Sequence, residues 1–180
     1  MTDGLIILDS AYKKAKYWRK IVTLEKLHPE DLRESSMAKL GNLFTSGAIC
    51  VIYVMKDEVI GECTAIPLQK VEREVLDNIV GLEKYLKVKT LYLHSIGVRP
   101  EAYSKEKISA HKGISIAMQM NSLVGKIAKD QNYNFIIGHA REGMSLNVAV
   151  KLGAKIIKEY SNWFGVGTSY YQVEADLKKA

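Results

Sequence analysis

The feature that most constrains the fold is a strand, a helix and a second strand that follow one another between Thr90 and Ala140. The first run, TLYLHSIGV, has the composition of a strand. The next, ISIAMQMNSLVGKIAKDQ, repeats apolar residues at helical spacing, and NFIIGHA is again strand-like. Two strands joined through a helix lie parallel in one sheet, with a right-handed connection. The sequence therefore predicts an α/β or α+β fold with a ligand crevice near the ends of these strands.

Five further runs predict strands that can pair antiparallel around this crossover. AICVIYVM and EVIGECTAIPL, joined by Lys56-Asp57, predict a β-hairpin. LIILDSA predicts an opening strand, and KIIKEY and TSYYQVEADL predict two closing strands. The predicted sheet is therefore mixed.

Three runs outside the crossover also predict helices. VEREVLDNIVGLEKYLKV places its apolar residues on one stripe and predicts one continuous helix. HPEDLRESSMAKLGNLF predicts a helix with Pro29 in its first turn, and MSLNVAVKLGA predicts a short helix that ends at Gly153. AYKKAKYWRKIVTLEKL is amphipathic but ambiguous. With three prolines, no repeat and no linker, residues 1–180 are predicted to form a single domain.

The composition limits the classes of protein to which the chain can belong. Its 180 residues are 47% hydrophobic and 26% charged, as in one soluble globular domain. No run approaches the roughly 20 apolar residues of a membrane helix. The N-terminus lacks the pattern of a secretory signal, so we expect a cytoplasmic protein without a membrane partner. Cys50 and Cys63 are expected to be buried reduced thiols, and no metal site is expected.

The net charge of +6 is compatible with a nucleic acid, an acidic partner or an anionic small ligand. The lysines are spread along the chain, without an arginine-rich cluster or an aromatic-and-basic strand motif. We therefore expect no nucleic-acid binding. An anionic cofactor needs only a few of these charges.

A long polar loop that ends near Gly113 separates the first strand of the crossover from its helix. The N-terminus of a helix attracts phosphate through its unpaired N–H groups, and a glycine there lets the backbone approach a ligand. Ser109 is a candidate cap of the helix. The nearby lysines are Lys105, Lys107 and Lys112. The loop is either a phosphate site or a solvated connection, and these residues alone do not separate the two interpretations.

From Leu91 to Leu177 the order of segments resembles the GNAT superfamily of N-acetyltransferases. The family's central motif is a strand ending in V-x-P, a loop R/Q-x-x-G-x-G/A and a long helix. Here LHSIGVRP, AHKGIS and IAMQMNSLVGKI stand in that order. The next motif of the family, a short strand and a helix ending in a K-L-G turn, corresponds to FIIGHA and MSLNVAVKLGAKII. The preceding hairpin fits the family's second and third strands.

The resemblance implies a central mixed sheet with helices on both faces and a parallel strand pair splayed at a site for acetyl-CoA. The SIGV strand would pair with the pantetheine arm, and amides at the start of the next helix would hold the pyrophosphate. A bulge near Gly97 would splay the strands and admit the thioester. The implied cofactor-binding residues are Ile96, Gly97, Val98, Lys112, Gly113, Ile114, Ser115, Ser145 and Asn147.

The sequence departs from the family pattern at four positions. Ala110 stands where the family has arginine or glutamine, and Ser115 where it has glycine or alanine. His111 replaces a common glycine, and Ala149 replaces a tyrosine that often protonates the CoA sulfur. These departures favour the alternative to an enzyme, which is a catalytically inactive GNAT-fold protein with a binding or regulatory role.

Several residues are candidates for proton transfer, although each can equally be a structural side chain. The glutamate base of many family members corresponds to His94 and Ser95 on the central strand. A histidine with a pKa near 6.5 suits proton removal through a water at about neutral pH. His139, on the neighbouring parallel strand, is the second candidate base. The candidate acids are Tyr160, Tyr170 and Tyr171.

We therefore expect an acetyl-CoA-dependent N-acetyltransferase that acts on a primary amine by direct transfer. The acceptor is a small-molecule or protein amine, and the sequence does not distinguish an antibiotic, a polyamine, an amino acid or a protein. The loop SNWFGVG, with Trp163 and Phe164, forms a wall of the acceptor pocket or, alternatively, a hydrophobic plug or a dimer contact. A homodimer is an expectation from the family.

Overall fold

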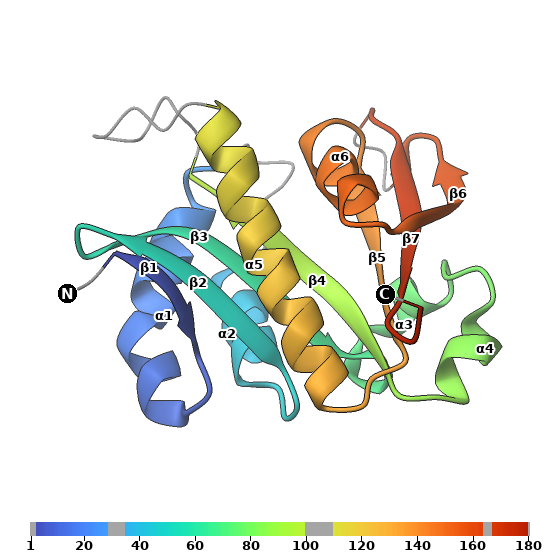
Figure 1. The fold of residues 1–180 in the computed structure, drawn as a ribbon, viewed down its shortest axis with the longest axis horizontal. Helices are drawn as coiled ribbons and strands as arrows, with labels where there is room; N and C mark the ends of the chain where they lie inside the picture. The colour runs from blue at the N-terminus through green and yellow to red at the C-terminus, as the bar shows by residue number, and fades with distance from the viewer. Residues whose placement is uncertain (1–2, 29–34, 100–109, 164–166, 180) are drawn as a thin grey trace. The chain divides into compact units, whose positions relative to one another are not determined.

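The computed structural model describes residues 3–28, 35–99, 110–163 and 167–179, and this part of the chain contains a mixed seven-stranded sheet (Figure 1). The strand order is β1-β2-β3-β4-β5-β7-β6, with β4 and β5 parallel, as the crossover predicted. The strands are β1 (Gly4–Ile7), β2 (Ile49–Met55), β3 (Glu58–Pro67), β4 (Thr90–Val98), β5 (Phe135–Arg141), β6 (Lys155–Tyr160) and β7 (Tyr170–Asp176). The helices are α1 (Ala11–Glu25), α2 (Ser36–Phe44), the 3-10 turn η2 (Leu68–Lys70), α3 (Arg73–Leu76), α4 (Leu82–Leu86), α5 (Ala110–Asp130) and α6 (Met144–Lys151).

The chain divides into two compact units. Unit 1 consists of Met1–Ala65 and His94–Val124, and unit 2 of Ile66–Leu93 and Gly125–Ala180. β4 and α5 therefore each contribute residues to both units. Among the described residues, no helix has the length and apolarity that crossing a membrane requires.

Unit 1 is built on the hairpin that the sequence predicted. β2 and β3 pair antiparallel, and the two residues of the turn, Lys56 and Asp57, have positive φ angles of 47° and 65°. Two positive φ angles are typical of a type I′ turn, whose twist matches that of the flanking strands. β1 pairs antiparallel with β2. Cys50 and Cys63 are buried free thiols, as expected, and burial raises the pKa of Cys50 to about 11.

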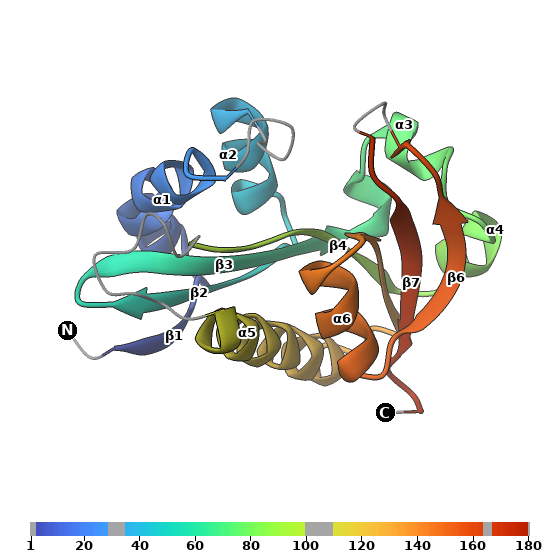
Figure 2. The ribbon, with the colours of Figure 1, turned by 90° about the horizontal axis from the view of Figure 1, so that it is seen from above.

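Helices cover both faces of the sheet in unit 1 (Figure 2), as the resemblance implied. α1 and α2 lie on one face and bury an apolar cluster that includes Ile21, Leu24 and Leu43. The N-terminal part of α5 lies on the other face, where a Cβ added to Gly61 would come within 2.9 Å of Met120 Cε. A glycine in β3 thus allows α5 to pack closely on the strand.

Serine caps begin α1 and α2. Ser10 Oγ and Ser35 Oγ each accept a backbone N–H from the third residue after them. The run that the sequence left ambiguous is therefore the helix α1. α2 begins at Ser36, and the predicted helix start at Pro29 lies outside the described residues.

Unit 2 contains the parallel pair and the two closing strands. β4 pairs with β5 from Thr90 to Leu93, β5 pairs antiparallel with β7, and β7 pairs antiparallel with β6. A Cβ added to Gly138 would lie 3.1 Å from the Leu93 carbonyl oxygen, so this glycine permits the close approach of the parallel strands. Gly153, with a φ of 88°, follows α6 and leads the chain into β6, as predicted.

The predicted continuous helix over residues 71–88 is wrong. The structure divides this run into the short helices α3 and α4. Gly81 precedes α4 with a left-handed φ of 74°, a conformation that a continuing helix does not contain. Asn78 Nδ2 donates to the Glu74 carbonyl at 2.9 Å and satisfies a carbonyl at the end of α3.

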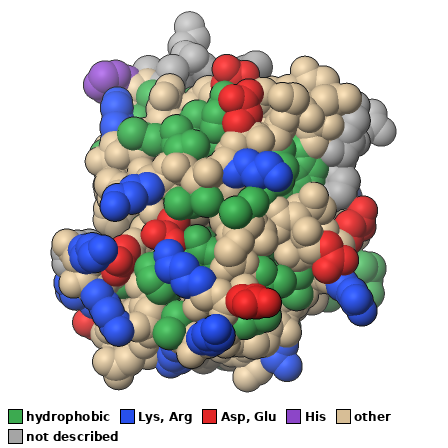
Figure 3. All heavy atoms as spheres, turned by 90° about the vertical axis from the view of Figure 1, so that its right-hand side faces the viewer, with side chains coloured by type: hydrophobic (Ala, Val, Ile, Leu, Met, Phe, Trp, Pro, Cys, Tyr) green, Lys and Arg blue, Asp and Glu red, His purple; other side chains and the backbone are tan. Residues whose placement is uncertain are grey.

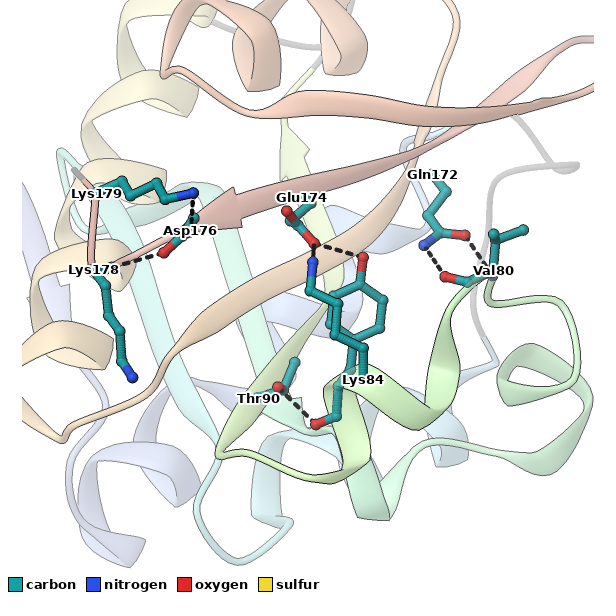
Figure 4. Close-up of polar contacts among 9 residues, drawn as sticks. Val80, Lys84, Thr90, Gln172, Glu174, Asp176, Lys178 and Lys179 are labelled. Carbon is teal, nitrogen blue, oxygen red and sulfur yellow. Dashed lines mark hydrogen bonds and ion pairs between the residues drawn. The ribbon is translucent and has the colours of Figure 1, made fainter.

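Two polar residues of β7 hold the same segment in place (Figure 4). The fully buried amide of Gln172 accepts the Val80 N–H at 2.8 Å and donates to the Val80 carbonyl at 3.0 Å. Glu174 Oε2 accepts hydrogen bonds from Lys84 Nζ at 2.5 Å and from Tyr85 Oη at 2.7 Å. Contacts with a strand 90 residues away therefore fix a path that helical periodicity does not predict.

Candidate active site

The parallel ladder between β4 and β5 is shorter than either strand. Its last pair is Leu93 with Gly138, whereas β4 continues to Val98 and β5 continues to Arg141. The candidate cofactor strand, Ile96 to Val98, and the candidate bases all lie in these continuations. Two groups of candidate residues result, one in unit 1 and one in unit 2.

The start of α5 belongs to the first group. Gly113 is buried, and a Cβ added to it would meet only the Val98 side chain, at an ordinary 3.8 Å. The packing of the described chain therefore does not itself require a glycine at this position. Lys112 is exposed, and its Nζ lies 3.6 Å from Met55 Sδ. The lysines expected at 105 and 107 and the cap expected at 109 lie outside the described residues.

Helix geometry separates the four amides that were predicted to hold pyrophosphate. α5 begins at Ala110, so Lys112 lies in its first turn, where N–H groups lack intrahelical partners. Gly113 ends that turn, and the N–H groups of Ile114 and Ser115 follow in the second turn. Ser115 Oγ is exposed and accepts a hydrogen bond from Gln119 Nε2 at 3.2 Å. The geometry thus favours the N–H of Lys112 over those of Gly113, Ile114 and Ser115, because the N–H of the fourth residue is paired in α1, α2 and α6, which begin in this way.

His94 and Ser95 face polar partners on the α2 side of unit 1. Asn42 Nδ2 lies 3.1 Å from His94 Nε2 and 3.4 Å from His94 Nδ1. Ser95 lies near enough to Glu62 to help lower the pKa of that carboxyl group. Nevertheless, the buried Ser95 Oγ forms no well-aligned hydrogen bond within the described part of the chain.

A buried ion network lies beneath these two residues. Lys39 Nζ is 2.5 Å from Glu62 Oε1 and 3.1 Å from Glu25 Oε2, and Thr64 Oγ1 donates to Glu62 Oε2 at 3.0 Å. Lys39 is 3% exposed and Glu62 is 2% exposed. Burial alone would raise the pKa of Glu62, but the Lys39 ammonium and its hydrogen bond outweigh burial and hold the pKa below its ordinary value. The network joins α1, α2 and β3 through charges that water does not screen.

His139 anchors the second group, in unit 2. Its Nδ1 lies 2.9 Å from Tyr92 Oη, and its ring packs edge-on against Trp163 with 3.7 Å between the ring centroids. The Tyr160 ring lies 5.2 Å from the imidazole. His139 Nε2 is buried without a hydrogen-bond partner among the described residues. Burial lowers the pKa of His139 to about 3, so the ring is neutral at physiological pH.

We expect the His139 ring to stay neutral down to about pH 4, because aromatic side chains replace the water that would solvate its charge. The imidazole of His139 therefore takes up a proton more readily in the unfolded chain than in the folded chain. The stability that depends on the neutral ring is present above about pH 6.5 and is lost as the pH falls towards about 3. An NMR titration of the four histidine rings measures this directly. The variant Tyr92→Phe should keep the low pKa of His139, whereas a midpoint near 6.5 would contradict the burial argument.

The other predicted site residues of unit 2 lie in more ordinary positions. The Tyr160 hydroxyl donates to the Asn78 carbonyl and lies 3.0 Å from Gln172 Oε1, contacts that hold β6 to the loop before α4. Ser145 is half-buried in the first turn of α6, and Asn147 is exposed on the same helix. Their roles toward a cofactor or a leaving group remain predictions.

Among the described residues, no group of three or more His, Cys, Asp or Glu side chains is placed to hold a metal ion.

Sequence reasoning missed Lys39, Glu62, Asn42 and Tyr92. Glu62 carried a signal, because it is the single charged residue inside the apolar run VIGECTAIP. A carboxylate at such a position is buried and needs a cation. The sequence does not indicate which lysine supplies the cation, since Lys39 reaches Glu62 from another element.

No protein-family model and no curated protein sequence matches the chain, but many solved structures share its fold. An aminoglycoside 6'-N-acetyltransferase from Enterococcus faecium is 16% identical, with 96% of this chain and 97% of that chain covered and a TM-score of 0.66. The ribosomal-protein-S18-alanine N-acetyltransferase from Escherichia coli is 7% identical, with 98% and 94% covered and a TM-score of 0.68. NAA60 of Arabidopsis thaliana, in complex with acetyl-CoA, is 14% identical, with 98% and 99% covered and a TM-score of 0.66. The chain therefore has the fold of the GNAT superfamily of N-acetyltransferases.

Proposed function

We propose that this protein is an N-acetyltransferase that moves an acetyl group from acetyl-CoA to a primary amine. The observation that carries the proposal is the start of α5, where a Cβ added to the buried Gly113 would meet, among the described residues, only the Val98 side chain at 3.8 Å. The unpaired N–H groups at the start of a helix suit a phosphate-bearing cofactor. The full-length likeness to acetyltransferases, one of them in complex with acetyl-CoA, supports the same function.

The proposed cofactor contacts follow from these positions. The backbone of β4 at Ile96, Gly97 and Val98 would pair with the pantetheine arm, and the first turn of α5 would meet the phosphates. On α6, Ser145 and Asn147 would contact the pantetheine side. Lys112 adds a point charge but lacks the fork with which arginine binds phosphate.

Bound acetyl-CoA would supply the acetyl group as a thioester. The residues of this chain would remove the proton from the amine and stabilise the charge that develops on the carbonyl oxygen. The acceptor must present a neutral amine, so its ammonium form has to lose one proton before the C–N bond forms. His94 is the proposed base, acting through a water. His139 is the second candidate, but burial lowers its pKa to about 3, so it would be a weak base for an ammonium group at neutral pH. A backbone N–H near Val98 would polarise the carbonyl group as the C–S bond breaks. Tyr160 stays a candidate acid for the thiolate, although its hydroxyl also contacts Asn78 and Gln172.

Calorimetric titration with acetyl-CoA and with free CoA tests the cofactor, and a thiol-release assay with a panel of amines tests turnover. We expect micromolar binding of both ligands and release of CoA with at least one amine. Binding without turnover of any amine would favour the second candidate, a GNAT-fold binding protein. The alanines at positions 110 and 149 favour that candidate. The absence of binding at millimolar cofactor would overturn the proposal.

We expect His94→Ala to lower kcat by about a hundredfold or more at pH 7, because general bases typically contribute 10²–10⁴ to a rate. The KM for acetyl-CoA should change little. His94→Gln is the matched control, since it keeps a hydrogen-bonding group opposite Asn42 but cannot serve as a base near neutral pH. Both variants should therefore lose activity. An unchanged kcat in either one would remove His94 as the base.

A further inference from the structure

Helices α1 and α2 of unit 1 form an apolar groove of about 540 Å³ that opens to solvent. The lining residues are Ala15, Trp18, Met37, Leu40, Gly41 and Phe44. Two of them, Ala15 and Gly41, are small, and a Cβ added to Gly41 would meet nothing within 4 Å among the described residues. The groove therefore has space beside Gly41.

Large apolar side chains at this groove are left in water. Met37 is 76% exposed and Phe44 is 43% exposed. Single exposed apolar residues are common, but several that line one hollow mark an interaction site. None of the candidate residues for acetyl transfer lines this groove.

Among the described residues of α1 and α2, the charged side chains that contact rings of this groove are basic. Lys14 Nζ lies 5.8 Å from the centre of the Phe44 ring, and Arg19 Cζ lies 5.5 Å from the Trp18 ring. In the described residues of α1 and α2 the single carboxylate is Glu25, which is paired with the buried Lys39. On the face of the molecule shown in Figure 3, by contrast, acidic and basic side chains are interspersed. The partner that matches this groove is therefore acidic as well as apolar.

We propose that the groove binds an acidic amphipathic helix of a partner protein. A bulky apolar side chain of that helix enters the groove beside Gly41, and its flanking carboxylates lie near Lys14 and Arg19. Helix-in-groove binding uses apolar anchors at helical spacing in this way. A hollow between two helices suits such an anchor better than a flat membrane does, because membrane-binding helices present a convex apolar face.

Fluorescence anisotropy of the full-length protein with labelled peptides tests the proposal. The probes are peptides with leucine, phenylalanine or tryptophan anchors at i, i+3, i+4 and i+7 and glutamate at the polar positions. A peptide with lysine in place of glutamate is the control for charge. We expect saturable micromolar binding of a glutamate peptide, weaker binding at high salt, and at least tenfold weaker binding of the lysine peptide.

Matched variants locate the site. Gly41→Phe fills the groove and should weaken binding at least tenfold, whereas Gly41→Ala leaves it open and should bind like the wild type. Lys14→Glu together with Arg19→Glu should also weaken binding, and Lys126→Glu, on the exposed surface of α5, should change it little. Circular dichroism confirms that each variant is folded.

Three results would overturn the proposal. In the first, no glutamate peptide saturates up to about millimolar concentration. In the second, Gly41→Phe binds as tightly as Gly41→Ala. In the third, phosphatidylserine vesicles bind the protein in sedimentation while the peptides do not, and the surface is then a membrane contact.

Discussion

Replacing Lys39 by methionine is expected to lower the free energy of unfolding by about 3–5 kcal/mol, as is usual when one partner of a buried ion pair is removed. Methionine fills much of the space of the lysine chain but supplies no charge. Glu62, which is 2% exposed, would then be a buried carboxylate without its cation. Chemical denaturation followed by circular dichroism measures the loss.

An ion pair on the surface serves as the control for the effect of burial on the free energy of unfolding. Lys13 and Asp9 also form an ion pair, with 3.0 Å between the charged atoms, but their side chains are 40% and 59% exposed. Lys13→Met should therefore cost less than about 1 kcal/mol. The double variant Lys39→Met, Glu62→Gln should be more stable than Lys39→Met alone, because it removes the unpaired charge. Equal losses for Lys13→Met and Lys39→Met would contradict the argument.

The same ion network makes the free energy of unfolding depend on pH. The pKa of Glu62 is lower in the folded chain than its ordinary value near 4.5, so the unfolded chain takes up this proton first as the pH falls. The stabilisation is fully present above that ordinary value and is lost as the pH falls from there through the lower pKa of the folded chain. Glu62→Gln should therefore show a smaller loss of stability between about pH 5 and pH 3 than the wild type.

The strands could be predicted from the sequence because alternating apolar and polar residues, or short apolar runs, indicate a strand without reference to distant parts of the chain. The hairpin around Lys56 and Asp57 and the crossover from β4 to β5 both follow from segment order. The helix predicted over residues 71–88 failed because Gly81 and contacts with β7 decide its path. The spacing of apolar residues along the chain carries no information about a left-handed glycine or about contacts with a distant strand.

The candidate site was predictable only in part, for a related reason. The positions of Gly113 and His94 followed from the order of strand, loop and helix. The cluster of His139 with Tyr92 and Trp163 joins residues from different elements. Contacts between residues of different elements depend on the register of the strands, which a single sequence does not determine.

Replacing Gly113 by aspartate is expected to weaken the binding of acetyl-CoA by about a hundredfold or more, equivalent to about 2.7 kcal/mol. The new side chain would occupy the space beside the first turn of α5, where the cofactor phosphates are proposed to lie. Its negative charge would also repel them. Because Gly113 is buried, the new carboxylate is also expected to lower the free energy of unfolding, so affinities are compared only at temperatures where the variant is folded. Isothermal titration calorimetry measures the affinity, and thermal unfolding measures the stability.

Two alanine variants on the same helix separate ligand contact from helix propensity. Gly113→Ala and Gly125→Ala each replace glycine by the best helix former, worth up to about 1 kcal/mol. Neither new Cβ comes within 3.4 Å of the rest of the described chain, so both variants should be at least as stable as the wild type. Gly113→Ala should nevertheless bind acetyl-CoA more weakly, because its methyl group lies where the ligand must approach, and Gly125→Ala should bind normally. If Gly113→Asp bound acetyl-CoA as the wild type does, the phosphates would have to lie elsewhere, since a charge and a side chain beside them must lower the affinity.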